Sequence, residues 1–263
     1  MSKSPGKRKQ VRPNRRLWNL GQRPKGRTRR TRRFSWLRKF PFKLFLGIIC
    51  VFLLFEIFTL PLFSIFSLDT KNPKETALMQ QRTEEARERG KKLTIDYRWV
   101  SLASVPKHVR KAVLIAEDAR FYNHAGIDWH EVGESFETNW EEGRIVRGGS
   151  TITQQLAKNL YLSTSRDPIR KFKELLIAWI LEATLSKKRI LELYLNIIEW
   201  GRGVFGIEAA AQRYFHKSAR QLTRVEAASL AAVIPSPLRH KPTELTPFLE
   251  KKKEVILQRM STR

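Results

Sequence analysis

Two adjacent carboxylates in "AEDARFYNHAGIDW", residues 116–129, are the first candidates for chemistry. Glu117 and Asp118 precede His124 near the end of a helix that the apolar spacing predicts over about 107–122. Three interpretations are open for them: a catalytic pair, half of a metal site, or the solvated face of an ordinary helix. The spacing of the neighbouring apolar residues helps to separate these.

Helical spacing places the two acids on different faces of the predicted helix. The positions that recur every four residues share one face of the helix, and here they are Val109, Val113, Glu117 and Phe121. Glu117 therefore projects from an apolar stripe, whereas Asp118 points about 100° away. Loss of water raises the pKa of a carboxyl group toward the range useful for proton transfer. A structural ion pair is as common for such an acid as catalysis, so both interpretations stay open.

A second polar cluster lies in "GGSTITQQLAKNLYL", residues 148–162. Its glycines permit close approach of the backbone, and the first turn of the following helix offers free N–H groups and hydroxyls to an anion. The GK[ST] ending of a P-loop is absent. The alternative is a capped amphipathic helix with an exposed amide face. Either way, one polar face is predicted to carry Gln154, Gln155, Lys158 and Asn159.

A third cluster lies in "DPIRKFKELLIAWILEATLSKKRILELYLN", residues 167–196. Arg170, Lys171 and Glu174 fall in the first turns of one predicted helix, and Lys187 and Asn196 at the two ends of the next. Glu174 could pair with Arg170 in a solvated contact worth about 0.2–0.5 kcal/mol. Clustered cations with one acid equally suit a diphosphate. The Trp, Leu and Ile positions between them are expected in the core, as are Tyr161 and Tyr194.

The elements that must position these clusters are predicted to be helical almost throughout from Pro106 onward. Asp167–Pro168 and Thr246–Pro247 are typical of an N-cap followed by proline, and capping boxes are predicted for Thr223 with Glu226 and Thr151 with Gln154. The segment "LTIDYRWVSLASVP", residues 93–106, predicts one short extended stretch. The pattern therefore predicts that residues 94–263 form one mainly α domain, without an internal repeat.

The N-terminal residues 1–43 have a different composition from the rest. They hold 17 of the 51 Lys and Arg residues and no acid, within a chain of formal charge +26. Arg, Pro and Gly without apolar periodicity predict a disordered tail. A nucleic-acid-binding arm is the alternative, but the apolar run that follows favours a cytoplasmic tail that sets membrane topology and attracts anionic lipid. No nucleic-acid partner is expected.

The 25 residues from Leu44 to Leu68 carry one charge, Glu56, and are predicted to form a single transmembrane helix. Their length exceeds the apolar region of about 7–15 residues in a cleaved signal peptide. Glu56 could face a partner helix or be a tolerated acid, and Pro61 could mark a helix end. Residues 69–93 are predicted to be a juxtamembrane linker. Cys50 is the only cysteine, which excludes a disulfide within the chain and a cysteine metal site.

Five stretches together resemble the peptidoglycan glycosyltransferases of glycosyltransferase family 51, which polymerise lipid II. In family order they are "EDARFYNHAG", "GGSTITQQL", "RKFKE", "KKRILELYLN" and "GRGVFGIEAAAQRYF", and they span most of residues 94–242. The stretch that begins "FGIEAAAQRYF" looks most like monofunctional biosynthetic transglycosylases of Gram-negative bacteria. Because the sequence ends at Arg263, a transpeptidase domain is not expected. The resemblance implies a lysozyme-like domain with a smaller membrane-associated lobe.

The resemblance also implies roles for individual residues. Glu117 matches the general base that takes the proton of the acceptor's 4-hydroxyl, and Glu174 matches a second glutamate that assists at the donor diphosphate, directly or through a divalent cation. Inversion at the donor anomeric carbon and release of undecaprenyl diphosphate are implied. No cofactor is implied with certainty, and Mg²⁺ or Mn²⁺ at the diphosphate is an open alternative. The positions matching those that hold diphosphate and sugar are Ser150, Gln154, Gln155, Lys158, Arg166, Lys171 and Lys187.

Other motif positions are expected to support the site rather than to react, and they are Asp118, His124, Gly149, Thr151, Arg170 and Asn196. One departure from the family pattern is Glu134, eight residues after Gly126, where many relatives carry Arg or Lys. The donor contact of that cation is therefore in question, and residues 131–147 are expected to hold the substrate in another way.

The membrane run and the resemblance together predict a single-pass protein of the inner membrane, with a cytoplasmic N-terminus and a periplasmic catalytic domain. The expected partners are lipid II, the growing glycan strand, membrane lipids, penicillin-binding proteins and the division or elongation machinery. Two alternatives are a lytic transglycosylase or lysozyme, which would normally need a second carboxylate, and a non-catalytic scaffold that recruits synthetic enzymes.

Overall fold

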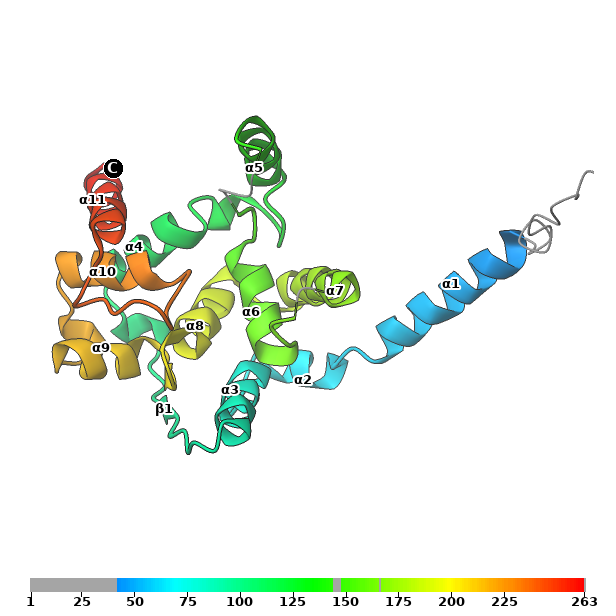
Figure 1. Ribbon diagram of the computed structural model, residues 1–263, viewed down its shortest axis with the longest axis horizontal. Coiled ribbons are helices and arrows are strands. Elements are labelled where there is room, and N and C mark those ends of the chain that lie inside the picture. Colours follow the sequence, from blue (N-terminus) through cyan, green and yellow to red (C-terminus); the bar gives the residue numbers. More distant parts are fainter. Residues whose placement is uncertain (1–41, 144–147, 166, 263) are drawn as a thin grey trace, which may run out of the picture. The chain divides into compact units, whose positions relative to one another are not determined.

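The computed structural model describes residues 42–143, 148–165 and 167–262 of the 263-residue chain (Figure 1). The predicted basic tail, apart from its last two residues, and Arg166 lie outside these ranges. The prediction of a mainly α protein is confirmed. The helices are α1 (Phe42–Phe58), α2 (Leu62–Ser67), α3 (Ala77–Glu88), α4 (Lys107–Glu117), α5 (Trp129–Glu141), α6 (Ile152–Tyr161), α7 (Pro168–Thr184), α8 (Lys187–Ile197), α9 (Ile207–Phe215), α10 (Arg224–Val233) and α11 (Pro247–Ser261).

The chain divides into two compact units, residues 1–50 and residues 51–263. Among the described residues, Leu44–Ser67 is the one stretch long and apolar enough to cross a membrane. Within it α1 ends at Phe58, and α2 begins after Pro61. Pro61 therefore marks a helix end, one of the alternatives that the sequence left open, and the run predicted as a single helix over 44–68 consists of two helices.

The second helix of the apolar run is part of the domain core. Ile65 of α2 is fully buried, and Leu68 just after it is also buried. Arg189 of α8 donates from Nε to the Leu68 carbonyl oxygen (2.8 Å), and its guanidinium also reaches Lys71 and Asn72. These contacts fix the chain to the domain directly after the apolar run, before the helix α3 that lies in the predicted linker segment.

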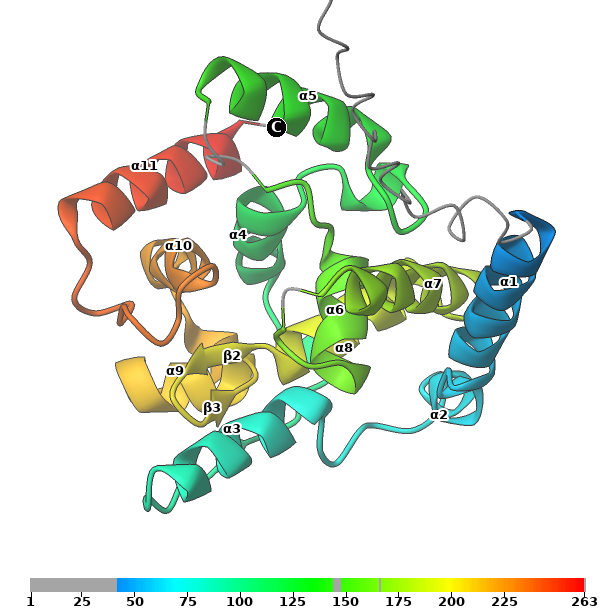
Figure 2. The same cartoon turned by 45° about the vertical axis from the view of Figure 1, so that its right-hand side comes forward.

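The core of the domain lies around α8, whose residues Ile190, Leu191, Leu193, Tyr194 and Leu195 are all fully buried. Helix α6 packs against both α7 and α8. Helix α4 packs against α10 and α11, which also contact each other, as both views show (Figure 1; Figure 2). Helices α4 and α6 thus come from neighbouring layers, and the segments that join them carry the polar clusters.

A small sheet lies beside the helices in the order β1 (Asp96–Tyr97), β3 (Val204–Phe205), β2 (Glu199–Gly201). Strand β1 pairs with β3 in parallel, and β2 pairs with β3 antiparallel. The extended stretch predicted before Pro106 is confirmed, although its strand has two residues. The sequence did not predict β2 and β3, because strands of two or three residues between helices carry too few positions for a period-2 pattern.

Asn196, at the end of α8, ties the extended segment to the core. Its Oδ1 accepts from the backbone N–H of Val100 (2.8 Å), and its Nδ2 donates to the Val100 carbonyl (2.9 Å) and to that of Glu192 (2.8 Å). The side chain is buried, and all its polar atoms have partners. This predicted support residue therefore holds the strand segment, not a ligand.

Helix caps follow the predictions closely. Asp167 and Thr246 each cap a helix that has proline in its first turn, and Thr223 with Glu226 forms a capping box. Thr151 caps α6 by accepting from the Gln154 N–H. The Gln154 side chain instead accepts from a lysine of α7, so the second half of the predicted box gives way to a tertiary contact.

Two predictions about helices are wrong. The helix predicted over 107–122 ends at Glu117, because Asp118 adopts φ −164° and uses its carboxylate in tertiary hydrogen bonds. Phe121 is buried as expected, but it belongs to a separate 3₁₀ turn, Phe121–Asn123. Trp179 of α7 was expected in the core and is 53% exposed, because its position on α7 faces away from α6 and α8.

Gly206 allows the turn between β3 and α9. Its φ is +86°, and a Cβ added there would lie 2.5 Å from the carbonyl oxygen of Asn196. We expect Gly206→Ala to lower the free energy of unfolding by about 1–3 kcal/mol, because both the backbone conformation and the contact become strained. Gly143→Ala is the matched control, since its φ is also positive, at +61°, but nothing lies within 4 Å of an added Cβ. Chemical unfolding in detergent measures the free energy of unfolding of both variants. A Gly206→Ala variant as stable as the wild type would contradict the prediction.

Candidate functional site

Glu117 is the last residue of α4, and its carboxylate has only one hydrogen-bond partner within the described part of the chain. Oε2 accepts from Gln155 Nε2 at 2.9 Å, whereas the buried Oε1 accepts from none of the described residues. Burial raises the pKa of Glu117, and the hydrogen bond from Gln155 and the charges of Lys252 and Lys158 partly oppose this. A buried, under-coordinated carboxylate of raised pKa is suited to accept a proton.

Two pockets of similar size meet at Glu117. One has a volume of about 570 Å³ and is lined by α4, the start of α5 and Arg259 of α11. The other has about 550 Å³ and is lined by α4, the segment after α10, and α11. Ser150 lines both pockets with Glu117. A ligand on each side could therefore reach the same carboxylate.

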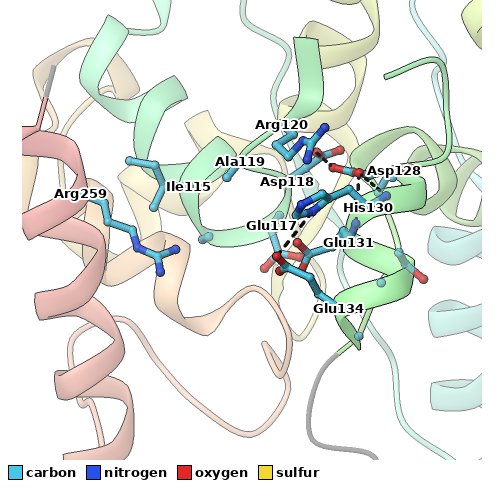
Figure 3. A pocket seen from close by; sticks show the side chains of 15 residues that line it. Ile115, Glu117, Asp118, Ala119, Arg120, Asp128, His130, Glu131, Glu134 and Arg259 are labelled. Atoms are coloured by element: carbon cyan, nitrogen blue, oxygen red, sulfur yellow. Dashed lines mark hydrogen bonds and ion pairs between the residues drawn. The ribbon is translucent and has the colours of Figure 1, made fainter. Parts of the chain in front are cut away.

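Figure 3 shows the first pocket, with Arg259 projecting from α11 on one side and residues of α5 on the other. His130 lies 3.5 Å from Glu134, measured from Nδ1 to Oε1, and Arg120 lies 3.4 Å from Asp128. Glu134 thus lines this pocket at the position where the family pattern has a cation. The walls carry charges of both signs.

Asp118 organises the loop around Glu117. Its Oδ2 accepts from the backbone N–H of Ile152 (3.0 Å), and its Oδ1 lies 3.0 Å from Nε2 of His124. Asp128 caps α5 by accepting from the N–H groups of His130 and Glu131. Asp118, His124 and Asp128 are close enough together to hold a metal ion, but the carboxylates already accept hydrogen bonds from the protein. This set fits a structural role, as the sequence suggested for Asp118 and His124.

The polar face of α6 points into the protein, so the alternative of an exposed amide face is wrong. Gln154 is 3% exposed and Asn159 is 8% exposed. Gln155 joins two residues of the site, because it donates to Glu117 and accepts from the hydroxyl of Tyr194 (2.9 Å). Tyr194 is fully buried, as predicted, and fixes the orientation of the amide that holds Glu117.

The loop before α6 is held by the hydroxyls of Ser150 and Thr151 and by packing of Gly149. Thr151 donates from its hydroxyl to the Gly126 carbonyl at 2.6 Å, which places the start of α6 beside the loop after α4. Gly149 packs against α5, where an added Cβ would lie 3.4 Å from Cα of Val132. Ser150 is exposed, and its hydroxyl accepts from Lys171 at 3.3 Å.

A buried acid gathers the cations of α7. Glu174 is 3% exposed, and its two oxygens pair with Arg170 NH1 (2.5 Å) and Lys171 Nζ (2.5 Å). The interpretation of the Glu174–Arg170 contact as a solvated pair is therefore wrong. Lys171 also reaches Gln154 at 3.4 Å. Burial lowers the pKa of Lys158, and the charges of Glu174 and Glu117 partly oppose this.

The structure does not bring Lys187 to this cluster. Its Nζ pairs with Glu182 (2.8 Å) and lies over the ring of Phe121, 4.3 Å from the centroid. Glu182 in turn accepts from the hydroxyl of Thr153 at 2.5 Å. These contacts give Lys187 a structural explanation, and its contact with substrate stays a prediction. So does that of Arg166, which lies outside the described residues.

Helix α11 supplies site residues that the motif analysis missed. Lys252 lines the second pocket with Glu117, together with His240 and Phe248. Burial lowers the pKa of Lys252, against the charge of Glu117. A signal was present in the sequence, because the apolar stripe of α11 (Leu249, Ile256 and Met260) includes position 252.

Comparison with known proteins identifies the architecture. The family model described as "Transglycosylase" matches residues 84–261. A "Biosynthetic peptidoglycan transglycosylase" of Nitrosospira multiformis is 46% identical over 191 residues, which cover 73% of this chain and 83% of that protein. Proteins of the same name from Chromobacterium violaceum and Bordetella pertussis are each 39% identical. They align over 220 and 233 residues, covering 84% and 87% of this chain and 96% and 95% of their own lengths.

The raised pKa of Glu117 predicts a stability effect with a definite sign. A carboxyl group whose pKa is higher in the folded state contributes stability at low pH, and this is lost as pH rises through the folded pKa. Glu117→Gln should therefore unfold at a higher temperature than the wild type near neutral pH, and the difference should shrink toward pH 4. Each kcal/mol corresponds to about 2–4 °C for a domain of this size.

Thermal unfolding in detergent between pH 4 and 8 measures this effect. Glu254→Gln on α11 is the control, since this exposed carboxylate should give no pH-dependent difference. A Glu117→Gln variant that is less stable than the wild type at neutral pH would contradict the prediction.

Proposed function

The chain belongs to the transglycosylase family, and on that premise we propose that it is a peptidoglycan glycosyltransferase that polymerises lipid II into glycan strands of the bacterial cell wall. One observation carries the proposal at the site: Glu117 is half-buried, has a buried carboxylate oxygen without a protein partner among the described residues, and lines two pockets. One pocket would hold the donor sugar and the other the acceptor.

The proposed step transfers one proton and one glycosyl group. The 4-hydroxyl of the acceptor loses its proton to Glu117, and the freed electron pair forms a bond to the donor anomeric carbon. The bond between that carbon and the diphosphate oxygen breaks, and undecaprenyl diphosphate leaves with the electron pair. Attack opposite the leaving group inverts the anomeric carbon, so an α-linked donor yields a β-1,4 linkage.

Glu117 has the properties that this step requires of a base. Its raised pKa lies nearer the operating pH than that of an ordinary carboxyl group, and a general base is most effective when the two are close. The hydrogen bond from Gln155 occupies Oε2, and this leaves Oε1 to meet the hydroxyl. Tyr194 donates to Gln155 and so fixes which end of the amide faces the carboxylate.

The cation cluster on α7, formed by Arg170 and Lys171, suits a diphosphate leaving group. A diphosphate gains negative charge on leaving, and fixed cations stabilise that charge. Lys171 donates to Ser150, which lines both pockets with Glu117, although Lys171 itself lines neither pocket. Lys158 adds a further cation that interacts with the charges of Glu174 and Glu117. In this proposal Glu174 positions Arg170 and Lys171, and these cations contact the diphosphate.

A divalent cation at Glu174 does not fit this arrangement. Both oxygens of the carboxylate are engaged by cationic side chains at 2.5 Å, and Lys158 adds a third positive charge nearby. A metal ion would have to displace Arg170 or Lys171 to reach the carboxylate. No step of the proposed reaction depends on a metal ion at this residue.

We propose that α5 associates with the membrane. The exposed side chains Trp129, Val132, Phe136 and Trp140 recur at helical spacing and form one apolar face, the α5 stripe. An exposed apolar helix face rimmed with aromatic residues suits the membrane interface. With the span at Leu44–Ser67, the proposal places the protein in the inner membrane, with the basic tail in the cytoplasm and the catalytic domain in the periplasm.

The substrates proposed for the site are lipid II and the growing glycan strand. Penicillin-binding proteins and the division or elongation machinery are proposed as further partners in the same membrane, because a glycan strand made here must be cross-linked by other enzymes.

Glycan hydrolysis is the second candidate function, and one observation favours it. Glu131 and Glu134 line the same pocket as Glu117, and a glycosidase uses two carboxylates about 5–9.5 Å apart. The cation cluster favours synthesis, because hydrolysis has no diphosphate to neutralise. The two functions differ in what they do to lipid II and to finished polymer.

We expect Glu117→Gln to lose polymerisation of lipid II by about 10²–10⁴-fold, since the amide cannot accept the proton. Product length from labelled lipid II, followed by gel electrophoresis in detergent, measures this. Glu254→Gln should retain the wild-type rate. If Glu117→Gln still makes polymer at the wild-type rate, Glu117 is not the general base. If the wild-type protein only shortens added polymer, the function is hydrolysis and not synthesis.

The α5 stripe should lie in an apolar environment when the protein is in a bilayer. A polarity-sensitive fluorophore on Phe136→Cys, in a Cys50→Ser background, should emit at shorter wavelength in proteoliposomes than the same label on Glu141→Cys. Position 141 lies more than a quarter turn from the stripe on the same helix, so it controls for the label. Identical spectra at both positions would contradict a membrane-bound α5.

A further inference from the structure

Glu56 is the single charged residue of the apolar run, and neither the proposed chemistry nor the resemblance gives it a role. A lone carboxylate in a membrane-spanning segment is costly and usually has a specific partner. Glu56 is only 8% exposed, although most of the apolar residues around it on α1 are exposed. This side chain is therefore covered where its neighbours are not.

The partner of Glu56 comes from the catalytic domain. Lys173 of α7 lies with its Nζ 2.5 Å from Oε2 of Glu56, and it donates to the hydroxyl of Thr59 at 3.1 Å. The side chains are 11% and 25% exposed. Removal of one member of a desolvated pair leaves the other charge buried and unpaired, so loss of either residue is expected to destabilise this contact.

Lys173 belongs to the same turns of α7 as the cation cluster but faces another way. Successive residues of a helix are about 100° apart, so Lys173 lies about 100° from Glu174 and about 60° from Arg170, at one edge of the side shared by Arg170, Lys171 and Glu174. One side of these turns therefore holds the end of α1, and another holds the cations of the cleft. A shift of α7 relative to α1 would move both sets of contacts together.

We propose that the Glu56–Lys173 pair is a positioning contact that seats α7 on the end of the membrane helix and so holds the cation cluster at the depth of the lipid headgroups. The proposal rests on the proposed function, because a substrate that is a membrane lipid keeps its diphosphate at that depth. The pair lies on the α1 side of the break at Thr59–Pro61, where the chain could otherwise bend. Lys173 and Glu56 act through the placement of α7 and do not touch the reacting atoms.

A charge-swap series tests this contact. The proteins are the wild type, Glu56→Gln, Lys173→Met and the double variant Glu56→Lys with Lys173→Glu; Lys188→Met, an exposed lysine of α8, is the control. In proteoliposomes we expect each single change to raise KM for long-chain lipid II about five- to tenfold with little change in kcat. The double variant should recover most of this loss. With a short-chain lipid II analogue in micelles, all five should behave alike.

A measurement without substrate separates this inference from the proposed function. Thermal unfolding in lipid nanodiscs should show a lower midpoint for each single variant, by about 2–4 °C or more, and recovery in the double variant. Lys188→Met should match the wild type. If the wild type made no polymer, the proposed function would fail while this unfolding series still tested the pair.

Three outcomes would overturn the inference. One is a double variant that recovers neither the midpoint nor KM, since the two charges would then not interact. Another is an equal loss of kcat with both substrates, which would place Lys173 in the cleft itself. The third is single variants that match the wild type in bilayers, which would mean that other contacts hold α7.

Discussion

The site depends on the hydrogen bonds that Asp118 makes at the junction of α4 and α6. Its carboxylate accepts from the Ile152 N–H and lies beside His124, so the end of one helix, the start of another and the intervening loop meet at one group. Because Asp118 leaves the helix here, α4 stops at Glu117 and the base occupies a helix end. Loss of this junction would free both Glu117 and the polar face of α6 that holds it.

The two acids of the site, Glu174 and Glu117, differ in their partners. Glu174 is surrounded by cations and spends both oxygens on them, which fixes Arg170 and Lys171 in place. Glu117 receives one amide hydrogen bond and keeps an oxygen without a protein partner among the described residues. Two glutamates on different helices, α4 and α7, therefore acquire opposite tasks from their surroundings.

Sequence reasoning located the helices, most caps and the stripe carrying Glu117, because these follow from local spacing and from side chains that act within one turn. It placed the helix end too late, since the tertiary bonds of Asp118 override local propensity. It also expected Trp179 in the core, because periodicity does not say which face of α7 is covered. The cation pairs of Glu174 were visible as spacings, but their burial depends on α6 and the loop before it, which no local pattern contains.

Charged residues on apolar stripes follow one rule in this protein. Glu117 on α4, Lys252 on α11 and Glu56 on α1 all interrupt an apolar face, and all three are at least half-buried. Glu117 and Lys252 line one pocket with opposite charges, whereas Glu56 finds Lys173 at 2.5 Å. A charge on a buried face must be compensated by a partner from another element. Where the partner is a close ion pair, the residue organises the fold; where an oxygen is left without a protein partner, it is available for chemistry.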